Sequence, residues 1–144
     1  MKKMIWTNEL SIGNLNIDNE HQKLIGIIND LVDLVILDGS REKFAEILSN
    51  LTDYVLIHLK KEEKYMKKIG YPKLKEHIQE HRDYSYKVAM YNIDFLGINP
   101  PEPKEIIEYL KKWWNNHILN FDTDFENYKN SIESDVKYPT LWIE

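Results

Sequence analysis

The chain has 144 residues, of which 42% are hydrophobic and 30% are charged, enough for one domain with one core. Its 19 basic and 24 acidic residues give a formal net charge of −5, which argues mildly against nucleic acid or an anionic membrane as the main partner. The absence of cysteine excludes disulfides, thiolate metal sites and cysteine-ligated iron–sulfur clusters.

No targeting or membrane segment is evident in the sequence. Met1 to Leu10 has two lysines but no apolar run after them, so we expect no signal peptide. The most apolar stretch, Leu31 to Leu37, is short and carries Asp33, so it is not expected to span a bilayer. The default expectation is a cytoplasmic protein.

Four helical patterns follow one another, separated by three breaks rich in glycine or proline. The expected helices are residues 18–37 with Asp18 as N-cap, 41–69 after Gly39 at C′ and Ser40 at the N-cap, 72–96 with Pro72 in the first turn, and 103–130 with Pro103 in the first turn. Short connections between long helices favour antiparallel neighbours. The predicted fold is therefore all-α, an antiparallel up-down-up-down four-helix bundle over about residues 18–130.

An N-terminal arm, residues 1–17, and a short C-terminal tail, residues 131–144, flank this bundle within a single domain of residues 1–144. Bare aromatic side chains in such segments would be an exposed liability. We therefore expect Trp6, Tyr138, Leu141 and Trp142 to dock onto the bundle.

All five histidines fall on the apolar stripes of these helices, where residues recur every three or four positions. They are His21, His58, His77, His81 and His117. Glu62 lies on the same stripe, and a buried carboxylate needs a compensating cation. A single histidine on an apolar helix face is more simply interpreted as a hydrogen-bonded residue of the core. Five imidazoles converging with carboxylates instead indicate a metal centre.

The spacing of the polar residues supports this interpretation. His58 and Glu62, like His77 and His81, are four residues apart and share a helix face. His117 and Asp122 are five apart, which fits one face only if the helix is locally distorted.

Seven ligands are too many for one tetrahedral zinc, and imidazole-rich sites suit calcium or magnesium poorly. Two octahedral ions, bridged by two carboxylates and an oxide or hydroxide, fit the donors and leave one position open. That vacancy suits a small diatomic ligand. The carboxylate type of di-iron bundle requires Glu-x-x-His motifs, and no histidine here has Glu three residues before it. The donors suit iron and manganese alike.

Four motifs together resemble the hemerythrin family, and within it the single-domain bacteriohemerythrins. They are Ile-Asp-Asn-Glu-His at 17–21, His-Leu-Lys-Lys-Glu-Glu at 58–63, Gly-Tyr-Pro at 70–72 leading to His77 and His81, and Trp113 to His117-Ile118 with Asp122. The resemblance covers roughly Trp6 to Tyr128.

The resemblance implies a non-haem di-iron centre. In it, His77, His81 and His117 hold one iron, His21 and His58 hold the other, and Glu62 and Asp122 bridge them with an oxide or hydroxide. It also implies that O2 binds reversibly at the second iron, in a pocket whose candidate residues are Leu59, Trp113, Trp114 and Ile118. Trp114 stands where the family commonly has a leucine that lines the O2 pocket. If its indole points into the bundle, it would narrow that pocket. If the indole points outward, it would pack on the C-terminal tail.

The leading functional hypothesis is an O2 carrier, store or scavenger. The alternatives are a sensory module for O2 or NO, acting through a separate partner, and a di-iron peroxidase or nitric oxide-handling enzyme. No additional acid–base group is evident on the stripes, so we do not expect an enzyme.

Overall fold

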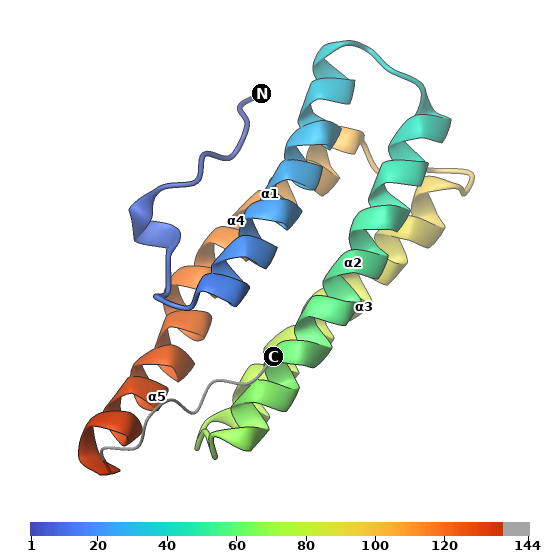
Figure 1. The fold of residues 1–144 in the computed structure, drawn as a ribbon. Helices are drawn as coiled ribbons and strands as arrows, with labels where there is room; N and C mark the ends of the chain where they lie inside the picture. The colour runs from blue at the N-terminus through green and yellow to red at the C-terminus, as the bar shows by residue number, and fades with distance from the viewer. Residues whose placement is uncertain (137–144) are drawn as a thin grey trace.

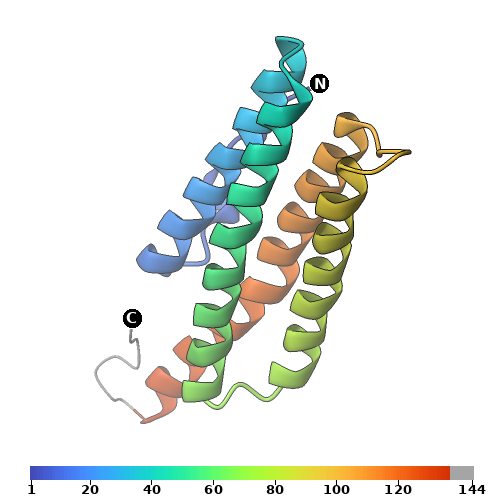
Figure 2. The same ribbon diagram turned by 90° about the vertical axis from the view of Figure 1, so that its right-hand side faces the viewer.

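The computed structural model describes residues 1–136, with side chains described as far as residue 133. Four long rods pack as an antiparallel bundle, as Figures 1 and 2 show. They are α1 (Leu15–Ile36), α2 (Arg41–Lys68), α3 (Leu74–Phe95) and a fourth rod of α4 (Pro103–His117), η2 (Ile118–Asp122) and α5 (Thr123–Val136). The arm carries one short helix, η1 (Asn8–Leu10), and the described residues contain no strand. The predicted all-α bundle is confirmed.

The arm leads into α1 differently from the prediction. The N-cap is Asn14, whose side-chain oxygen accepts a hydrogen bond from the Ile17 amide at 3.2 Å. Asp18, predicted as the cap, lies inside the helix, so that prediction was wrong. Its carboxylate accepts hydrogen bonds from the Ile12 amide, at 2.9 Å, and from the Ser11 hydroxyl, and thereby ties the arm to α1.

The turn between α1 and α2 also differs by one residue. Asp38, with φ of 54°, occupies the left-handed C′ position that was predicted for Gly39. Gly39 follows it, and the side chain of Leu34 occupies the space where a Cβ would lie. Ser40 is the N-cap of α2, as predicted, and accepts from the Lys43 amide at 3.1 Å.

At the far end of α2, Gly70 takes the left-handed C′ position with φ of 69°. Pro72 was predicted in the first turn of α3, but it lies in the preceding turn, because α3 begins only at Leu74. Pro103 is the first residue of α4, as predicted.

The fourth rod is interrupted rather than one continuous helix, and it extends past the predicted end at residue 130 to Val136. Between α4 and α5, η2 is a π-helical turn in which the Thr123 amide donates to the Ile118 carbonyl five residues earlier. The Thr123 hydroxyl donates to the same carbonyl at 3.0 Å. The local distortion predicted from the spacing of His117 and Asp122 is therefore present.

Apolar side chains fill the half of the bundle near the α1–α2 turn, with Leu31, Leu48 and Phe95 among the fully buried ones. The arm packs against this core through Trp6, as predicted, and the Met4 backbone pairs with Asn29. Tyr138, Leu141 and Trp142 lie outside the described residues. No helix in the described part of the chain is long and apolar enough to cross a membrane.

Candidate metal centre

A cluster of seven polar side chains occupies the other half of the bundle. His21 comes from α1, His58 and Glu62 from α2, His77 and His81 from α3, His117 from α4 and Asp122 from η2. None of these side chains is more than 2% exposed. Every residue predicted as a metal ligand is thus found in one buried cluster.

The seven residues form two groups that share both carboxylates. One group contains His21 and His58, and the other contains His77, His81 and His117; Glu62 and Asp122 belong to both. In each group, the possible ligand atoms lie within 4.8 Å of one another.

Glu62 and Asp122 each divide their two oxygens between the groups. Oε2 of Glu62 lies 2.7 Å from His58 Nε2, whereas Oε1 lies 3.2 Å from His81 Nε2. Oδ2 of Asp122 lies 3.1 Å from His21 Nε2, whereas Oδ1 lies 3.0 Å from His117 Nε2. Both carboxylates are therefore shared between the two histidine groups.

The π-turn makes this arrangement possible on the fourth rod. His117 ends α4 and Asp122 ends η2, so the extra residue of the wider turn lies between them. Asp122 is consequently fully buried, and its Oδ1 also lies 3.2 Å from His77 Nε2.

The donor atoms are poorly satisfied by one another, which supports a metal. His21 Nε2 lies 3.1 Å from His58 Nε2, and His77 Nε2 lies 3.2 Å from His117 Nε2. Both oxygens of Asp122 are buried without a well-aligned hydrogen bond, although imidazole nitrogens are close. Buried polar atoms need partners, and a cation between the converging atoms would satisfy them together.

Without a metal, the cluster balances its charge with protons on the imidazoles. Burial alone would lower the pKa of His58, but the charge of Glu62 and the hydrogen bond to Glu20 outweigh it and raise the pKa to about 10. Burial would raise the pKa of Glu62, yet the facing imidazolium of His58 pushes it well below its usual range. A metal ion must therefore displace protons from this site.

Two carboxylates outside the cluster hold the far side of two rings. Glu20 Oε1 lies 2.7 Å from His58 Nδ1, and its other oxygen pairs with Lys61 Nζ at 2.8 Å. Glu63 Oε2 lies 2.8 Å from His81 Nδ1. Such contacts fix the tautomer and orientation of metal-binding imidazoles. The hydrogen bond from His58, together with Lys61, lowers the pKa of Glu20 to about 2 although partial burial opposes the shift.

Sequence reasoning missed both Glu20 and Glu63. A signal for both was present, because each is the direct chain neighbour of a candidate metal ligand. Glu20 precedes His21, and Glu63 follows Glu62. Neighbouring residues point in different directions on a helix, however, so each reaches a histidine of another helix.

Trp114 points into the bundle, which decides the orientation left open by the sequence. It is fully buried, and its ring centroid lies 5.9 Å from His21, 5.8 Å from His58 and 5.9 Å from His117. Its indole N–H donates to the Tyr84 hydroxyl at 3.1 Å.

The other pocket candidates take different positions. Trp113 is half-buried and stacks on the His117 ring, with centroids 4.2 Å apart and planes inclined by 13°. Leu59 and Ile118 are buried in the core.

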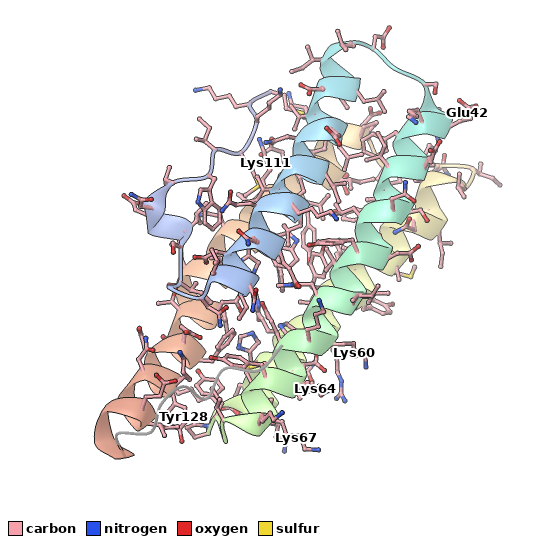
Figure 3. All side chains as sticks on the ribbon, viewed as in Figure 1. Glu42, Lys60, Lys64, Lys67, Lys111 and Tyr128 are labelled. Atoms are coloured by element: carbon pink, nitrogen blue, oxygen red, sulfur yellow. The ribbon has the colours of Figure 1, made fainter. Side chains whose placement is uncertain are left out.

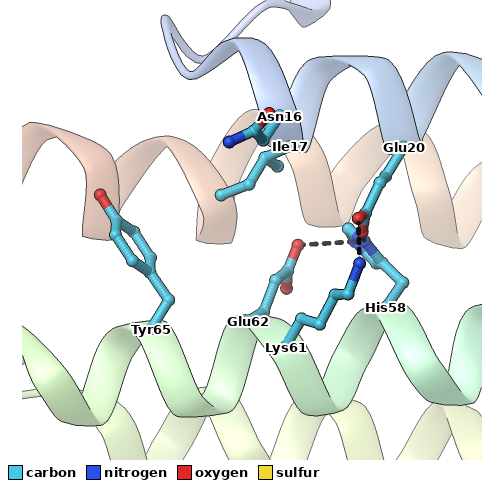
Figure 4. Close-up of a pocket in the computed structure, with 7 residues that line it drawn as sticks. All are labelled: Asn16, Ile17, Glu20, His58, Lys61, Glu62 and Tyr65. Carbon is cyan, nitrogen blue, oxygen red and sulfur yellow. Dashed lines mark hydrogen bonds and ion pairs between the residues drawn. The ribbon is translucent and has the colours of Figure 1, made fainter. Parts of the chain in front are cut away.

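A small cavity of about 20 Å³ adjoins the cluster between α1 and α2 (Figure 4). Its lining includes His58 and Glu62 on the inner side, Ile17 and Tyr65 on the walls, and Glu20 toward the surface. A space of this size accommodates roughly one water-sized molecule.

The sequence from residue 13 to 126 matches the family model described as the hemerythrin HHE cation-binding domain. This chain belongs to the hemerythrin family. It is 31% identical over 125 residues to a bacteriohemerythrin of Clostridium acetobutylicum, covering 84% of this chain and 97% of that protein. It is 30% identical over 138 residues to a bacteriohemerythrin of Pseudomonas aeruginosa, covering 95% of this chain and 89% of that protein.

Solved structures agree with this assignment. The crystal structure of a wild-type hemerythrin superposes with a TM-score of 0.81 at 27% identity, covering 88% of this chain and 97% of that one. Membership of a cation-binding family, together with the buried histidine and carboxylate cluster, makes this a site suited to metal binding.

Proposed function

We propose that this protein binds two iron ions in the cluster and binds O2 reversibly at the pair. The observation that carries the proposal is the division of Glu62 and Asp122, each of which turns one oxygen to each histidine group. Two carboxylates shared in this way match a two-ion site, whereas a single ion would leave one group unsatisfied.

In this proposal His77, His81 and His117 would hold one iron, His21 and His58 would hold the other, and both carboxylates would be shared by the two. The second ion would have one imidazole fewer and would therefore be the one to accept an external ligand. Iron in its ferrous state supplies the electrons that O2 takes up on binding, and the protein supplies the enclosure. Our proposal extends to a role as an O2 carrier, store or scavenger.

The side chains that enclose the group of His21 and His58 are mostly apolar. Trp114 covers the side of His21 and His58, and Leu59 and Ile118 are apolar side chains buried in the bundle core. Because the indole N–H is already engaged by Tyr84, Trp114 acts as a wall and offers no hydrogen bond to a ligand. The cavity beside His58 and Glu62 adjoins this side of the cluster, and we propose it as the entry for a small neutral molecule.

The test is to load the anaerobic protein with ferrous iron, count the bound iron, and record the visible spectrum as O2 is added and removed. We expect two irons per chain and a colour that bleaches on deoxygenation and returns on re-exposure. A colour that forms once and never reverses would refute reversible binding and favour redox enzymology or sensing.

A further inference from the structure

A groove of about 350 Å³ runs along the outside of the bundle between α2 and α3 and reaches the metal cluster from the surface. We call it the α2–α3 groove. Its more deeply placed lining residues are Leu59, Ile78 and His81, and its exposed ones include Leu56, Lys60 and Arg82. One candidate metal ligand therefore lies at the bottom of a surface depression.

The groove is positively charged on a chain that is negative as a whole. Figure 3 shows Lys60 and Lys64 extending from α2 away from the bundle. Within the described residues, neither Lys64 nor Arg82 forms an ion pair. The only carboxylate in the lining is Glu63, which is engaged by His81 Nδ1 at 2.8 Å. With a net charge of −5 for the whole chain, this face is a local exception.

Exposed apolar side chains adjoin these cations. Ile57 is 62% exposed and Leu56 is 43% exposed, and Ile57 lies in a shallow depression whose other lining residues include Lys60 and Lys64. An apolar centre with a charged rim is typical of a protein-binding surface. Positive potential on such a surface selects and steers an acidic partner.

The position of His81 indicates what such a partner would do. Its Nε2 faces the cluster, 3.2 Å from Glu62, while its Nδ1 side borders the groove through Glu63. The ring thus spans the wall between the surface and the centre. The cavity beside His58 is a poor alternative, because it is only about 20 Å³ and its lysine, Lys61, is paired with Glu20.

We propose that the α2–α3 groove is the docking surface of a small acidic electron-carrier protein, of the flavin or iron–sulfur class, that reduces the centre through His81. The inference rests on the proposed function, since a reversible O2 site works only while both irons are ferrous. Each oxidised pair must regain two electrons. Two reduced carriers lose one electron each, each ferric ion gains one, and no atom is transferred.

The test uses the oxidised, iron-loaded protein and a reduced acidic flavodoxin as the probe, with loss of the ferric absorption followed by stopped flow. We expect the wild-type rate to fall as salt rises. The double variant Lys60→Glu with Arg82→Glu should react at least tenfold more slowly at low salt. The double variant Lys104→Glu with Lys112→Glu, an equal change of charge at two exposed positions of α4, should stay within twofold. With reduced methyl viologen, a small cationic reductant, the groove variant should be no slower than wild type.

Binding of oxidised flavodoxin, followed by flavin fluorescence, separates docking from the iron chemistry, and we expect the groove variant to weaken it at least tenfold. Equal rates and affinities for the groove variant and the Lys104/Lys112 control would overturn the docking proposal, as would burial of the groove in a stable dimer or on anionic vesicles. If O2 binding proves irreversible while groove-dependent flavodoxin binding persists, the proposed function fails and the docking surface stands. If O2 binding is reversible but reduction does not depend on the groove, the proposed function stands and the docking surface fails.

Discussion

Trp114 determines how closely the metal cluster is enclosed, and Trp114→Leu tests this role. The indole is fully buried, lies within 6 Å of three histidine rings by centroid distance and donates a hydrogen bond to Tyr84. Leucine shortens the wall on the side of His21 and His58 and leaves the Tyr84 hydroxyl without this partner.

The cost follows from the volume and the lost hydrogen bond. The change removes roughly 60 Å³ of side chain, and at about 24 cal/mol per Å³ an uncollapsed cavity costs about 1.4 kcal/mol. An unsatisfied buried hydroxyl at Tyr84 adds about 1 kcal/mol or more, for a total of about 2–4 kcal/mol. If the centre binds O2 at two irons as proposed, the wider pocket should release O2 at least tenfold faster and autoxidise faster, because small ligands and water would reach the metal more easily.

Denaturant unfolding measures the loss of stability. Stopped-flow O2 release and the lifetime of the oxygenated form measure the effect on the pocket. Ile106→Ala, at the far end of α4, is the matched control, since it destabilises a fully buried site away from the cluster. Trp114→Phe keeps a ring but no N–H and should lose about 2 kcal/mol, about half from the lost volume and half from the lost hydrogen bond, with little change in O2 release. If Trp114→Leu releases O2 and autoxidises at the rates of Ile106→Ala, the enclosing role is refuted.

Three further predictions concern the centre and the fold. Glu62→Gln removes the shared charge between the two groups, so iron measured by mass spectrometry should fall from two per chain to one or none, while the exposed control Glu46→Gln keeps two. Metal loading at pH 7 should release protons to an indicator dye, because His58, with a pKa of about 10, is protonated there and must become neutral to bind a metal. The apparent affinity for the metal should therefore weaken as the pH falls. Loading without proton release would contradict this prediction. Asn14→Ala removes the N-cap of α1 and should cost about 1 kcal/mol in urea unfolding, so an unchanged midpoint would argue against the cap.

Much of the fold was predictable because the helix rules are local. The three- and four-residue periodicity of apolar side chains identified four helices, and Ser40 and Pro103 marked two helix starts correctly. The same periodicity placed His58 with Glu62, and His77 with His81, on inward faces, where the structure has them.

The errors arose where a local signal had two equivalent readings. Asn14 and Asp18 are both good N-caps, and only the contact of Asp18 with the arm distinguishes them. The orientation of Trp114 was left open, because periodicity alone did not decide whether this side chain points into the bundle or outward. Contacts between helices, such as that of Glu20 with His58, depend on how neighbouring helices are aligned along their axes, and the sequence does not show this alignment.

The spacing of His117 and Asp122 carried the most information because it broke the local rule. In an undistorted helix, residues five apart do not share a face, so an inward Asp122 required a wider turn. The structure has that turn, and the Thr123 hydroxyl supports its Ile118 carbonyl. A π-turn is unfavourable on its own, and local rules tend to be violated where function demands it. Here the demand is specific: without the extra residue, Asp122 would leave the two histidine groups with Glu62 as their only shared carboxylate.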